Sequence, residues 1–333
     1  NMSLLKTINI FFIIFLLSFE CIAKDIPIIV IAPSKSAQSY SSVGTSVTSI
    51  DREQINKSGK FFLGEVLNGN SVGMNYFRSG GHGTVSGIQL RGLPKRYSTV
   101  YIDGVKMSDP SSVSNDFDFN NILTSQVSRV EILKGNQSSV YGSGAIGGTL
   151  HIFTKKGEEG FHKDINYIAG SHNTHNLSAS LSGGDENKKY YIGFQRFQTD
   201  GISQMTHNDE KDRYRNNTLV ANYAHEFTDK IEFKSNLRIA ETYTQYDKET
   251  NTSTADHSEE LDGVQSSSNI ALVYKPNNQL TNKITLANTY IERIAAATVS
   301  SGNANQDNYY GNRNAITYQG NYNLNLDQLI YLD

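Results

Sequence analysis

Long segments in which polar and apolar residues alternate fill the chain after about Gly157. Ile231, Phe233 and Ile239, for example, fall on one face of such a segment, and the residues on its opposite face are polar. The same alternation returns in residues 316–326. A period of two with one strongly polar face is typical of a strand with lipid on one side and water on the other. About nine such segments follow one another, each near the ~10 residues that a tilted strand needs to cross a bilayer.

The connections between these segments alternate in length, which is a second, independent signal. Short connections rich in Gly, Asn and Asp occupy residues 183–188, 228–230, 276–279 and 325–328, and long polar loops occupy residues 199–214, 242–263 and 299–308. The first loop, residues 170–173, is short for its class. Outer-membrane barrels pair short periplasmic turns with longer extracellular loops. A soluble β-sandwich also alternates, but its turns recur every ~8–12 residues and need no such asymmetry. We therefore predict a transmembrane antiparallel β-barrel.

The chain before Gly157 has a different, mixed pattern. Short apolar strand-like segments occupy residues 43–50, 85–91, 99–102 and 127–133, with a helical turn from Asp51 and a helical segment at residues 63–67. Glycines separate many of these segments. This pattern predicts an α+β domain with its own core.

The N-terminus reads as a secretory signal. Met2 and Lys6 precede an unbroken apolar run at residues 10–17, and small residues at 21–23 offer a cleavage site. The run is too short to span a bilayer as a helix. Cys21 is the only cysteine and would leave with the signal, so we expect an exported protein without disulfides.

Composition narrows the function further. The chain has 30 Lys and Arg against 33 Asp and Glu, so no charge field favours nucleic acid. Nineteen tyrosines suit membrane interfaces, although tryptophan is absent. No hydrolase or metalloprotease motif is found, and we predict no enzyme activity. Residues 142–147 match a dinucleotide fingerprint formally, but a strand-like segment follows them where a helix is required, so we reject nucleotide binding.

Four motifs in the glycine-rich stretch occur in a family order and spacing. They are residues 88–92 (IQLRG), 100–105 (VYIDGV), 130–135 (VEILKG) and 141–148 (YGSGAIGG). Together they resemble the plug domain of TonB-dependent outer-membrane receptors. Asn136 and His151 depart from the residues usual in the family at these positions, and neither threatens the assignment.

The resemblance implies a domain order and a role. We expect a signal peptide at residues 1–23, a TonB box and linker at 24–42, a plug domain at 43–157 and the N-terminal part of the barrel at 158–333. Plugged transporters have ~22 strands, and an open sheet edge in lipid leaves backbone groups unpaired; we therefore expect further strands after Asp333. The implied role is import of a scarce, bulky nutrient across the bacterial outer membrane, without a required cofactor.

The segment after the signal resembles the TonB box in place and composition. Its β-branched residues are Ile28, Ile29, Val30 and Ile31. An extended segment of this kind can add a strand to the sheet of a partner protein, here TonB of the inner membrane. The alternative is an ordinary first strand of the plug domain.

Two charged residues lie in otherwise apolar segments of the expected plug domain. Arg91 and Glu131 should each need a partner if buried. One interpretation is a salt bridge that only holds the plug in shape. The other is a latch between plug and barrel that yields during transport.

Among family members the layout most resembles the vitamin B12 (cobalamin) receptor, and this likeness suggests ligand and metal residues. The plug loops that would contact ligand carry Arg78, Ser79, Gly80, Gly81, His82, Ser108, Asp109 and Ser111. Oxygen ligands for Ca²⁺ in the long loops would come from Asp200, Asp209, Asp212, Tyr246 and Asp247. The alternative for these acidic residues is an ordinary solvated loop.

Two other functions stay open. Within the class, the cargo could be a ferric siderophore or haem. From a different class, the chain could belong to a passive porin or an adhesin barrel.

Overall fold

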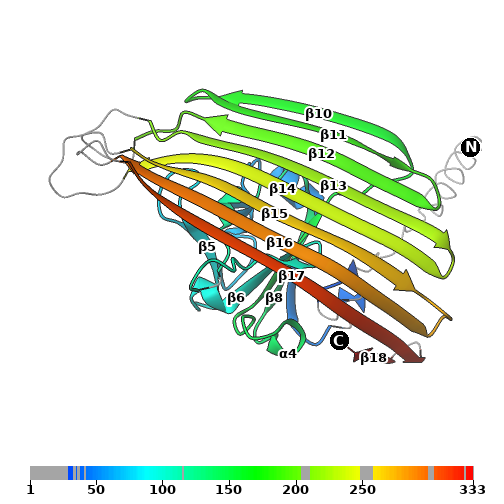
Figure 1. Cartoon of the computed structure of the whole chain (residues 1–333). Helices are drawn as coiled ribbons and strands as arrows, with labels where there is room; N and C mark the ends of the chain where they lie inside the picture. Colours follow the sequence, from blue (N-terminus) through cyan, green and yellow to red (C-terminus); the bar gives the residue numbers. More distant parts are fainter. Residues whose placement is uncertain are drawn as a thin grey trace, which may run out of the picture.

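The computed structural model describes residues 29–32, 35, 38–40, 43–114, 116–203, 211–247, 258–298, 304–325 and 328–332. The expected signal peptide and Ile28 lie outside these residues. Figure 1 shows an α+β domain lying against one face of a long antiparallel sheet. We call the first the plug domain and the second the wall.

The plug domain is built on a five-stranded sheet with the order β3-β8-β9-β6-β7. Strands β6 and β9 run parallel, and the other neighbours are antiparallel. The strands are β3 (Ser46–Ile50), β6 (Ser98–Ile102), β7 (Val105–Lys106), β8 (Val127–Lys134) and β9 (Gly148–Thr154). The remaining elements are α2 (Arg52–Lys57), α3 (Leu63–Leu67), β4 (Met74–Arg78), β5 (Ser86–Leu90), η2 (Lys95–Tyr97), η3 (Phe119–Asn121) and α4 (Ser138–Tyr141).

Local sequence explains the two helices that cover this sheet. Helix α2 begins with a capping box, in which Asp51 and Gln54 satisfy each other's backbone N–H groups. Helix α3 spans the residues predicted for it, and four of its five residues are buried. Gly64 of this helix lies under the Tyr76 ring, where an added Cβ would meet a ring carbon at 2.3 Å. Small size therefore lets α3 approach β4.

The predicted Asp-Gly turn joins β6 to β7. Asp103 and Gly104 have φ of 47° and 84°, and two successive positive φ values are what a two-residue hairpin turn requires. The Asp103 carboxylate also accepts hydrogen bonds from Thr154 N and Oγ1, at 3.1 and 2.6 Å. The turn is thereby tied to the end of β9.

The wall is one antiparallel sheet of nine strands that pair in sequence order. This confirms the fold class predicted from the alternating segments. The strands are β10 (Gly160–Gly170), β11 (Thr174–Gly184), β12 (Lys188–Thr199), β13 (Tyr214–Thr228), β14 (Ile231–Asp247), β15 (Ser258–Tyr274), β16 (Leu280–Thr298), β17 (Ala304–Asn325) and β18 (Gln328–Leu332). Among the described residues, no helix is long and apolar enough to cross a membrane.

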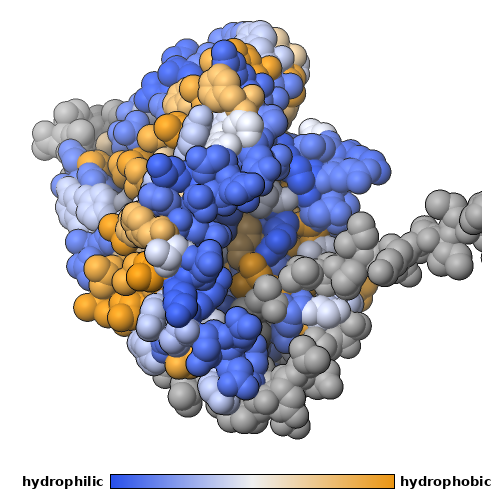
Figure 2. Space-filling model, turned by 90° about the vertical axis from the view of Figure 1, so that its right-hand side faces the viewer, coloured by the Kyte–Doolittle hydropathy of each residue, from blue (hydrophilic) through white to orange (hydrophobic). Residues whose placement is uncertain are grey.

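Alternation along each wall strand separates an inner face from an outer face. On β13, Tyr214, Asn216 and Thr218 are buried against the plug domain, whereas Leu219 and Tyr223 on the opposite face are 37% and 39% exposed. Apolar side chains of other strands share that outer face, among them Ile192, Leu272, Leu286 and Ile316. In Figure 2, apolar side chains gather along the left flank of the molecule, on the wall side. The outer face thus suits lipid.

Two of the three long loops, those predicted at residues 242–263 and 299–308, are shorter than predicted. Strand β14 continues to Asp247 and β15 begins at Ser258, inside the stretch 242–263 that we expected to be loop. Cross-strand contacts explain the extension, because Tyr243 Oη donates to Glu260 Oε1 at 2.6 Å. A strand that extends beyond the lipid region does not need apolar side chains. The polar residues that we took as the start of a loop therefore still belong to the strand.

The change of architecture falls between Thr154, which ends β9, and Gly160, which begins β10. The N-terminal segment adds a small hairpin to the plug domain, formed by β1 (Ile29–Val30) and β2 (Gln38–Ser39).

Candidate ligand site and plug–wall interface

Polar side chains on the inner face of the wall hold backbone groups of the plug domain. Around η3, Tyr214 Oη donates to Asn120 O at 3.0 Å, and Arg238 Nη2 donates to Asn121 O at 2.5 Å. Farther along, Asn269 Nδ2 donates to Asp103 O at 2.8 Å. Individual hydrogen bonds of this kind contribute little net stability. Beside these polar contacts, a small buried cluster of apolar and aromatic side chains from both parts also crosses the interface.

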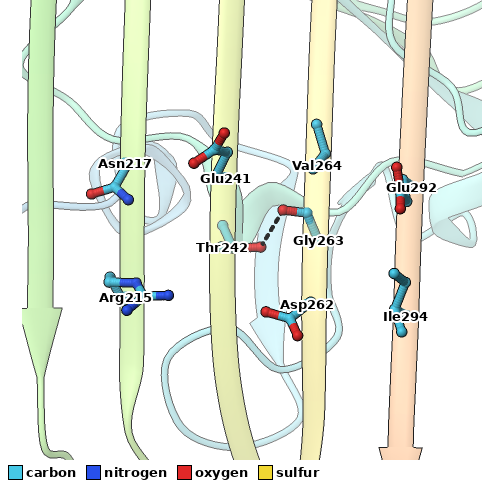
Figure 3. Close-up of a pocket in the computed structure, with 9 residues that line it drawn as sticks. All are labelled: Arg215, Asn217, Glu241, Thr242, Asp262, Gly263, Val264, Glu292 and Ile294. Carbon is cyan, nitrogen blue, oxygen red and sulfur yellow. Dashed lines mark hydrogen bonds between the residues drawn. The ribbon is translucent and has the colours of Figure 1, made fainter. Parts of the chain in front are cut away.

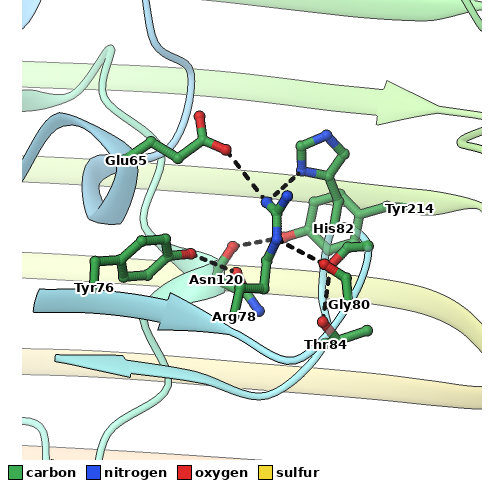
Figure 4. A network of polar contacts seen from close by, with 9 residues as sticks. Glu65, Tyr76, Arg78, Gly80, His82, Thr84, Asn120 and Tyr214 are labelled. Atoms are coloured by element: carbon green, nitrogen blue, oxygen red, sulfur yellow. Dashed lines mark hydrogen bonds and ion pairs between the residues drawn. The ribbon is translucent and has the colours of Figure 1, made fainter. Parts of the chain in front are cut away.

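The first apex loop, residues 78–84, turns back on itself through Arg78 (Figure 4). The guanidinium donates to Gly80 O at 2.9 Å, pairs with Glu65 Oε1 at 3.3 Å and contacts His82 Nδ1 at 3.2 Å. His82 in turn stacks on Phe62 with ring centroids 4.6 Å apart. These contacts hold the loop in one shape.

His82 is a neutral acceptor in this loop. Burial, with the nearby Arg78 charge, lowers the pKa of His82 to about 4. Since Arg78 can only donate, the Nδ1 atom that faces it must accept, which leaves hydrogen on Nε2. His82 also lies beside Phe197 and Tyr214 of the wall, at centroid distances of 5.5 and 6.1 Å. The ring thus links the plug domain to the wall.

The second apex loop, residues 106–112, is held by two arginines of the wall. Arg293 Nη2 pairs with Asp109 Oδ2 at 3.1 Å and donates to Ser111 Oγ at 3.2 Å. Arg313 Nη2 donates to Ser108 O at 2.5 Å and to Lys106 O at 3.1 Å. Both arginines project inward from β16 and β17.

A cavity of about 340 Å³ lies between the two apex loops and strands β14–β16. The charged side chains that face it are Lys95, Asp109, Asp116, Asp118 and Arg293. Glu292 also borders it, but its side chain projects to the outer face of the wall, where Tyr290 Oη donates to it at 2.5 Å. Lys95 Nζ pairs with Asp116 Oδ2 at 2.9 Å, and this pairing, with a hydrogen bond from Ser112, lowers the pKa of Asp116 despite its burial. Burial raises the pKa of Asp118. The volume and the mixture of charges suit a polar small molecule.

The predicted ligand residues have mixed outcomes in this geometry. Asp109 lines the cavity. Arg78, Gly80 and His82 instead form the internal network of the first apex loop, and Ser79 Oγ donates to Val85 O at 3.1 Å. The remaining predicted residues, Gly81, Ser108 and Ser111, take part in loop or wall hydrogen bonds. Their role in ligand binding stays a prediction.

Sequence reasoning missed Lys95, Asp118 and Arg293 among the charged residues of the cavity. Glu292 and Arg293 are neighbours on one predicted strand, and alternation alone puts them on opposite faces. Which of the two faces the plug could not be read from the pattern. Lys95 lies in a short 3₁₀ turn that carries no recognisable signal.

A second cavity, of about 230 Å³, lies on the outer face of the wall (Figure 3). Arg215 and Asn217 line it, and their neighbours Tyr214 and Asn216 point inward to the plug domain. It is therefore separated from the interior site by the wall itself.

The proposed plug-to-barrel latch needs correction. Arg91 is exposed and has φ of 53°, just after the end of β5, so the premise that it lies in an apolar strand is wrong. Glu131 is fully buried as expected. Its partners are the backbone N–H groups of Ile31 and Ala32 and the Arg129 guanidinium. Among the described residues, Glu131 makes these hydrogen bonds and this ion pair within the plug domain and not with the wall.

The predicted TonB-box residues lie partly within the described chain. Ile29 and Val30 form β1, Val30 is fully buried, and Ile31 follows directly. Strand β1 pairs with β2 in the register Ile29↔Ser39 and Val30↔Gln38. The segment is therefore docked on the plug domain.

The predicted calcium residues are not brought together in the described part of the chain. No group of three or more His, Cys, Asp or Glu side chains placed to hold a metal occurs among the described residues. Asp200 lies 4.0 Å from Arg213, and Asp212 is buried. Tyr246 and Asp247 are at the end of β14, and Asp209 lies outside the described residues. A calcium site stays a prediction.

Residues 39–149 match the family model of the TonB-dependent receptor plug domain. The match includes all four motifs on which the resemblance rested. Residues 39–149 therefore carry a TonB-dependent receptor plug domain, and a large antiparallel sheet follows it in the chain. The plug-domain match agrees with the expected outer-membrane location, which is also that of the ferripyoverdine receptor described next.

Solved structures with a similar fold are siderophore receptors. The ferripyoverdine receptor of the Pseudomonas aeruginosa outer membrane aligns over 91% of this chain with a TM-score of 0.70 and 14% identity. A mutant ferric enterobactin receptor from Pseudomonas aeruginosa aligns over 85% with a TM-score of 0.62 and 17% identity. The ferric-catecholate receptor Fiu of E. coli K12 aligns over 89% with a TM-score of 0.66 and 14% identity. The chain spans 43%, 47% and 49% of those three structures.

Proposed function

We propose that this chain forms the plug and first nine strands of a receptor that actively imports a ferric siderophore across the outer membrane. The observation that carries the proposal is the cavity between the apex loops and the wall, at the end of the wall where the long loops lie. The fold of the ferripyoverdine and ferric enterobactin receptors supports a siderophore over cobalamin, the cargo that we first expected.

The cavity offers charged groups to a ligand that carries its own charges. Arg293 and Lys95 line it, and each is already paired with an aspartate. A negatively charged iron chelate would compete with Asp109 for Arg293, because Arg binds planar oxygen anions with two parallel hydrogen bonds. Binding would then loosen the contact between the second apex loop and β16.

Energy for import would come from TonB through the docked N-terminal segment. An extended segment can pair with a sheet edge of the partner by main-chain hydrogen bonds. We expect Ile28→Pro and Val30→Pro to bind ligand normally and to fail in transport, because proline removes a ladder donor. Normal uptake by both variants would contradict this assignment of the TonB box.

The cargo is tested by binding to the full-length receptor in detergent. Ferripyoverdine, ferric enterobactin, haem and cyanocobalamin are titrated, the last with and without Ca²⁺. Tight binding of a ferric siderophore, weakened about tenfold or more by Arg293→Gln, is the expected result. Arg215→Gln, the same change on the outer face of the wall, is the control and should leave affinity unchanged. Tight binding of cyanocobalamin alone, strengthened by Ca²⁺, would contradict the proposal of a siderophore cargo. It would also support the predicted calcium site at the loop aspartates.

A passive barrel is the rival from another class. Radiolabelled iron uptake by cells that carry the receptor is measured before and after the proton gradient is collapsed. We expect uptake to stop when the gradient is lost. Uptake that persists at the same rate would favour a passive porin.

A further inference from the structure

We propose that Glu131 and Tyr141 form a clasp that holds the N-terminal segment docked, and that this clasp sets how available the segment is to its partner. By the clasp we mean the two side chains that bind the backbone of Ile31 and Ala32. The inference rests on the proposed function for its biological meaning, but the clasp itself is a property of the plug domain.

The Glu131 carboxylate is the centre of the clasp. Its Oε2 atom accepts hydrogen bonds from the backbone N–H groups of Ile31 at 2.9 Å and Ala32 at 2.7 Å. Its Oε1 atom forms an ion pair with Arg129 Nε at 3.0 Å. The side chain is 0% exposed. Hydrogen bonds to a buried carboxylate are stronger than those between neutral groups, so the segment is fixed by charge as well as by packing.

Tyr141 binds Ala32 through the carbonyl group of that residue. The Tyr141 hydroxyl donates to Ala32 O, so both backbone polar groups of Ala32 are bound by the plug domain. Val30 and Ala32 also pack into a small apolar cluster, separate from the main core, with Val47, Tyr101, Leu133, Tyr141 and Ala145. Backbone and side chains of the segment are thus anchored together.

Undocking the segment is unfavourable for a specific reason. When Ile31 and Ala32 leave, the Glu131 carboxylate loses two hydrogen-bond donors and keeps the ion pair with Arg129. A buried carboxylate that loses hydrogen-bond donors is disfavoured. The segment's backbone is meanwhile committed to β2. A partner that adds its own strand must therefore compete with both the clasp and β2. In the receptor without ligand, the segment is for this reason poorly available to the partner.

The clasp also directs where a pulling force would act. Glu131 lies on β8, which pairs with β3 on one side and β9 on the other. Force on Ile31 and Ala32 would therefore act directly on an interior strand of the plug sheet. Of the two roles that the sequence left open for Glu131, the latch to the barrel gives way in this proposal to an attachment to the N-terminal segment.

The test is a nitroxide spin label on Ile29→Cys in the full-length receptor, on an otherwise cysteine-free background and without ligand. We expect Glu131→Gln to raise the ratio of mobile to immobile label about tenfold, because the amide oxygen is uncharged and a weaker acceptor. Tyr141→Phe, which keeps the ring, should raise it less. Glu65→Gln is the control, because Glu65 also pairs with an arginine of the plug domain but not with the segment. An equally immobile label in Glu131→Gln and Tyr141→Phe would overturn the clasp.

A second readout separates the clasp from the proposed function. The periplasmic domain of TonB is titrated against the same spin-labelled receptors without ligand. Tighter binding to Glu131→Gln than to the wild type or Glu65→Gln is expected. A freed label without any TonB binding would keep the clasp and remove the proposed partner. TonB binding with an immobile label in both clasp variants would keep the partner and remove the clasp.

Discussion

At the residue scale, two glycines with the same backbone conformation differ in what surrounds them. Gly69 and Gly83 both have φ of 85°. An added Cβ at Gly69 would meet nothing within 4 Å, whereas at Gly83 it would meet Thr244 Oγ1 at 2.1 Å and the Tyr214 ring at 2.6 Å. Gly83 is therefore needed twice, for its conformation and for the closeness of the first apex loop to the wall.

We predict that Gly83→Ala destabilises the receptor more than Gly69→Ala. Both variants bear the left-handed strain of about 1 kcal/mol, but only Gly83→Ala must push the loop from the wall, at a further ~1–3 kcal/mol. Thermal unfolding of the full-length receptor and proteolysis of the loop measure the two effects. Equal melting temperatures and equal cleavage would mean that the loop does not depend on contact with the wall.

His82 should make stability depend on pH. Its pKa is about 4 in the folded plug, against 6.5 ordinarily, so the unfolded state binds more protons between these values. Stability from this group is present above about pH 6.5 and is lost as pH falls toward 4. His82→Phe keeps an aromatic ring on Phe62. Its melting temperature should depend less on pH between 4 and 6.5 than that of the wild type. Buried Asp118 has a raised pKa and acts in the opposite direction, so the comparison is made between the two proteins. An unchanged pH profile would contradict the buried, neutral ring.

At the element scale, β17 should control the order of the second apex loop. Arg313 on this strand holds two carbonyls of the loop. We expect Arg313→Gln to speed backbone hydrogen exchange in residues 106–114 about tenfold, because the hydrogen bonds from a charged donor are lost. Arg215→Gln, on the outer face, should leave that exchange as it was. Equal protection in both variants would show that Pro110 and its packing on Gly311 hold the loop instead.

Elements with local causes were predictable from the sequence, and contacts across the chain were not. Helix α3 and the Asp103-Gly104 turn follow from short patterns, and the wall follows from its period of two. Glu131 could be recognised as a buried charge in need of a partner. Its ion-pair partner Arg129 is two positions away, but its two backbone donors lie 99 and 100 positions away in sequence, and no local pattern carries that information. Arg91 was misjudged because one left-handed residue at the end of a strand changes the direction of a side chain.

The candidate site was predicted only in part for the same reason. The apex loops were expected to face ligand, and Asp109 does line the cavity. The inward direction of Arg293 depends on the register of β16 against its neighbours, and a shift of one residue would exchange the two faces.

At the scale of the whole molecule, the wall is a boundary between a polar interior and a lipid-facing exterior. The outer face carries Ile284, Leu286, Ile316 and Tyr318 toward the end with the short turns. Toward the end with the long loops the same face carries the cavity lined by Glu241, Asp262 and Glu292. The apolar band and the charged rim lie on the same strands, so depth in the membrane can be read along a single strand.

Strand β16 allows that depth to be tested with two variants. We predict that Leu286→Arg destabilises the full-length receptor in lipid vesicles by ~2–4 kcal/mol, because Leu286 lies within the apolar band, whereas Ile294→Arg costs only ~0–1 kcal/mol beside the charged rim. Denaturant titration of the vesicle-inserted protein measures both. The two positions are on the outer face of one strand and carry side chains of the same size. The difference between their losses of unfolding free energy therefore reflects how apolar the surroundings of each position are. Equal effects would mean that lipid does not cover the face around Leu286, and the wall would then have to meet protein there.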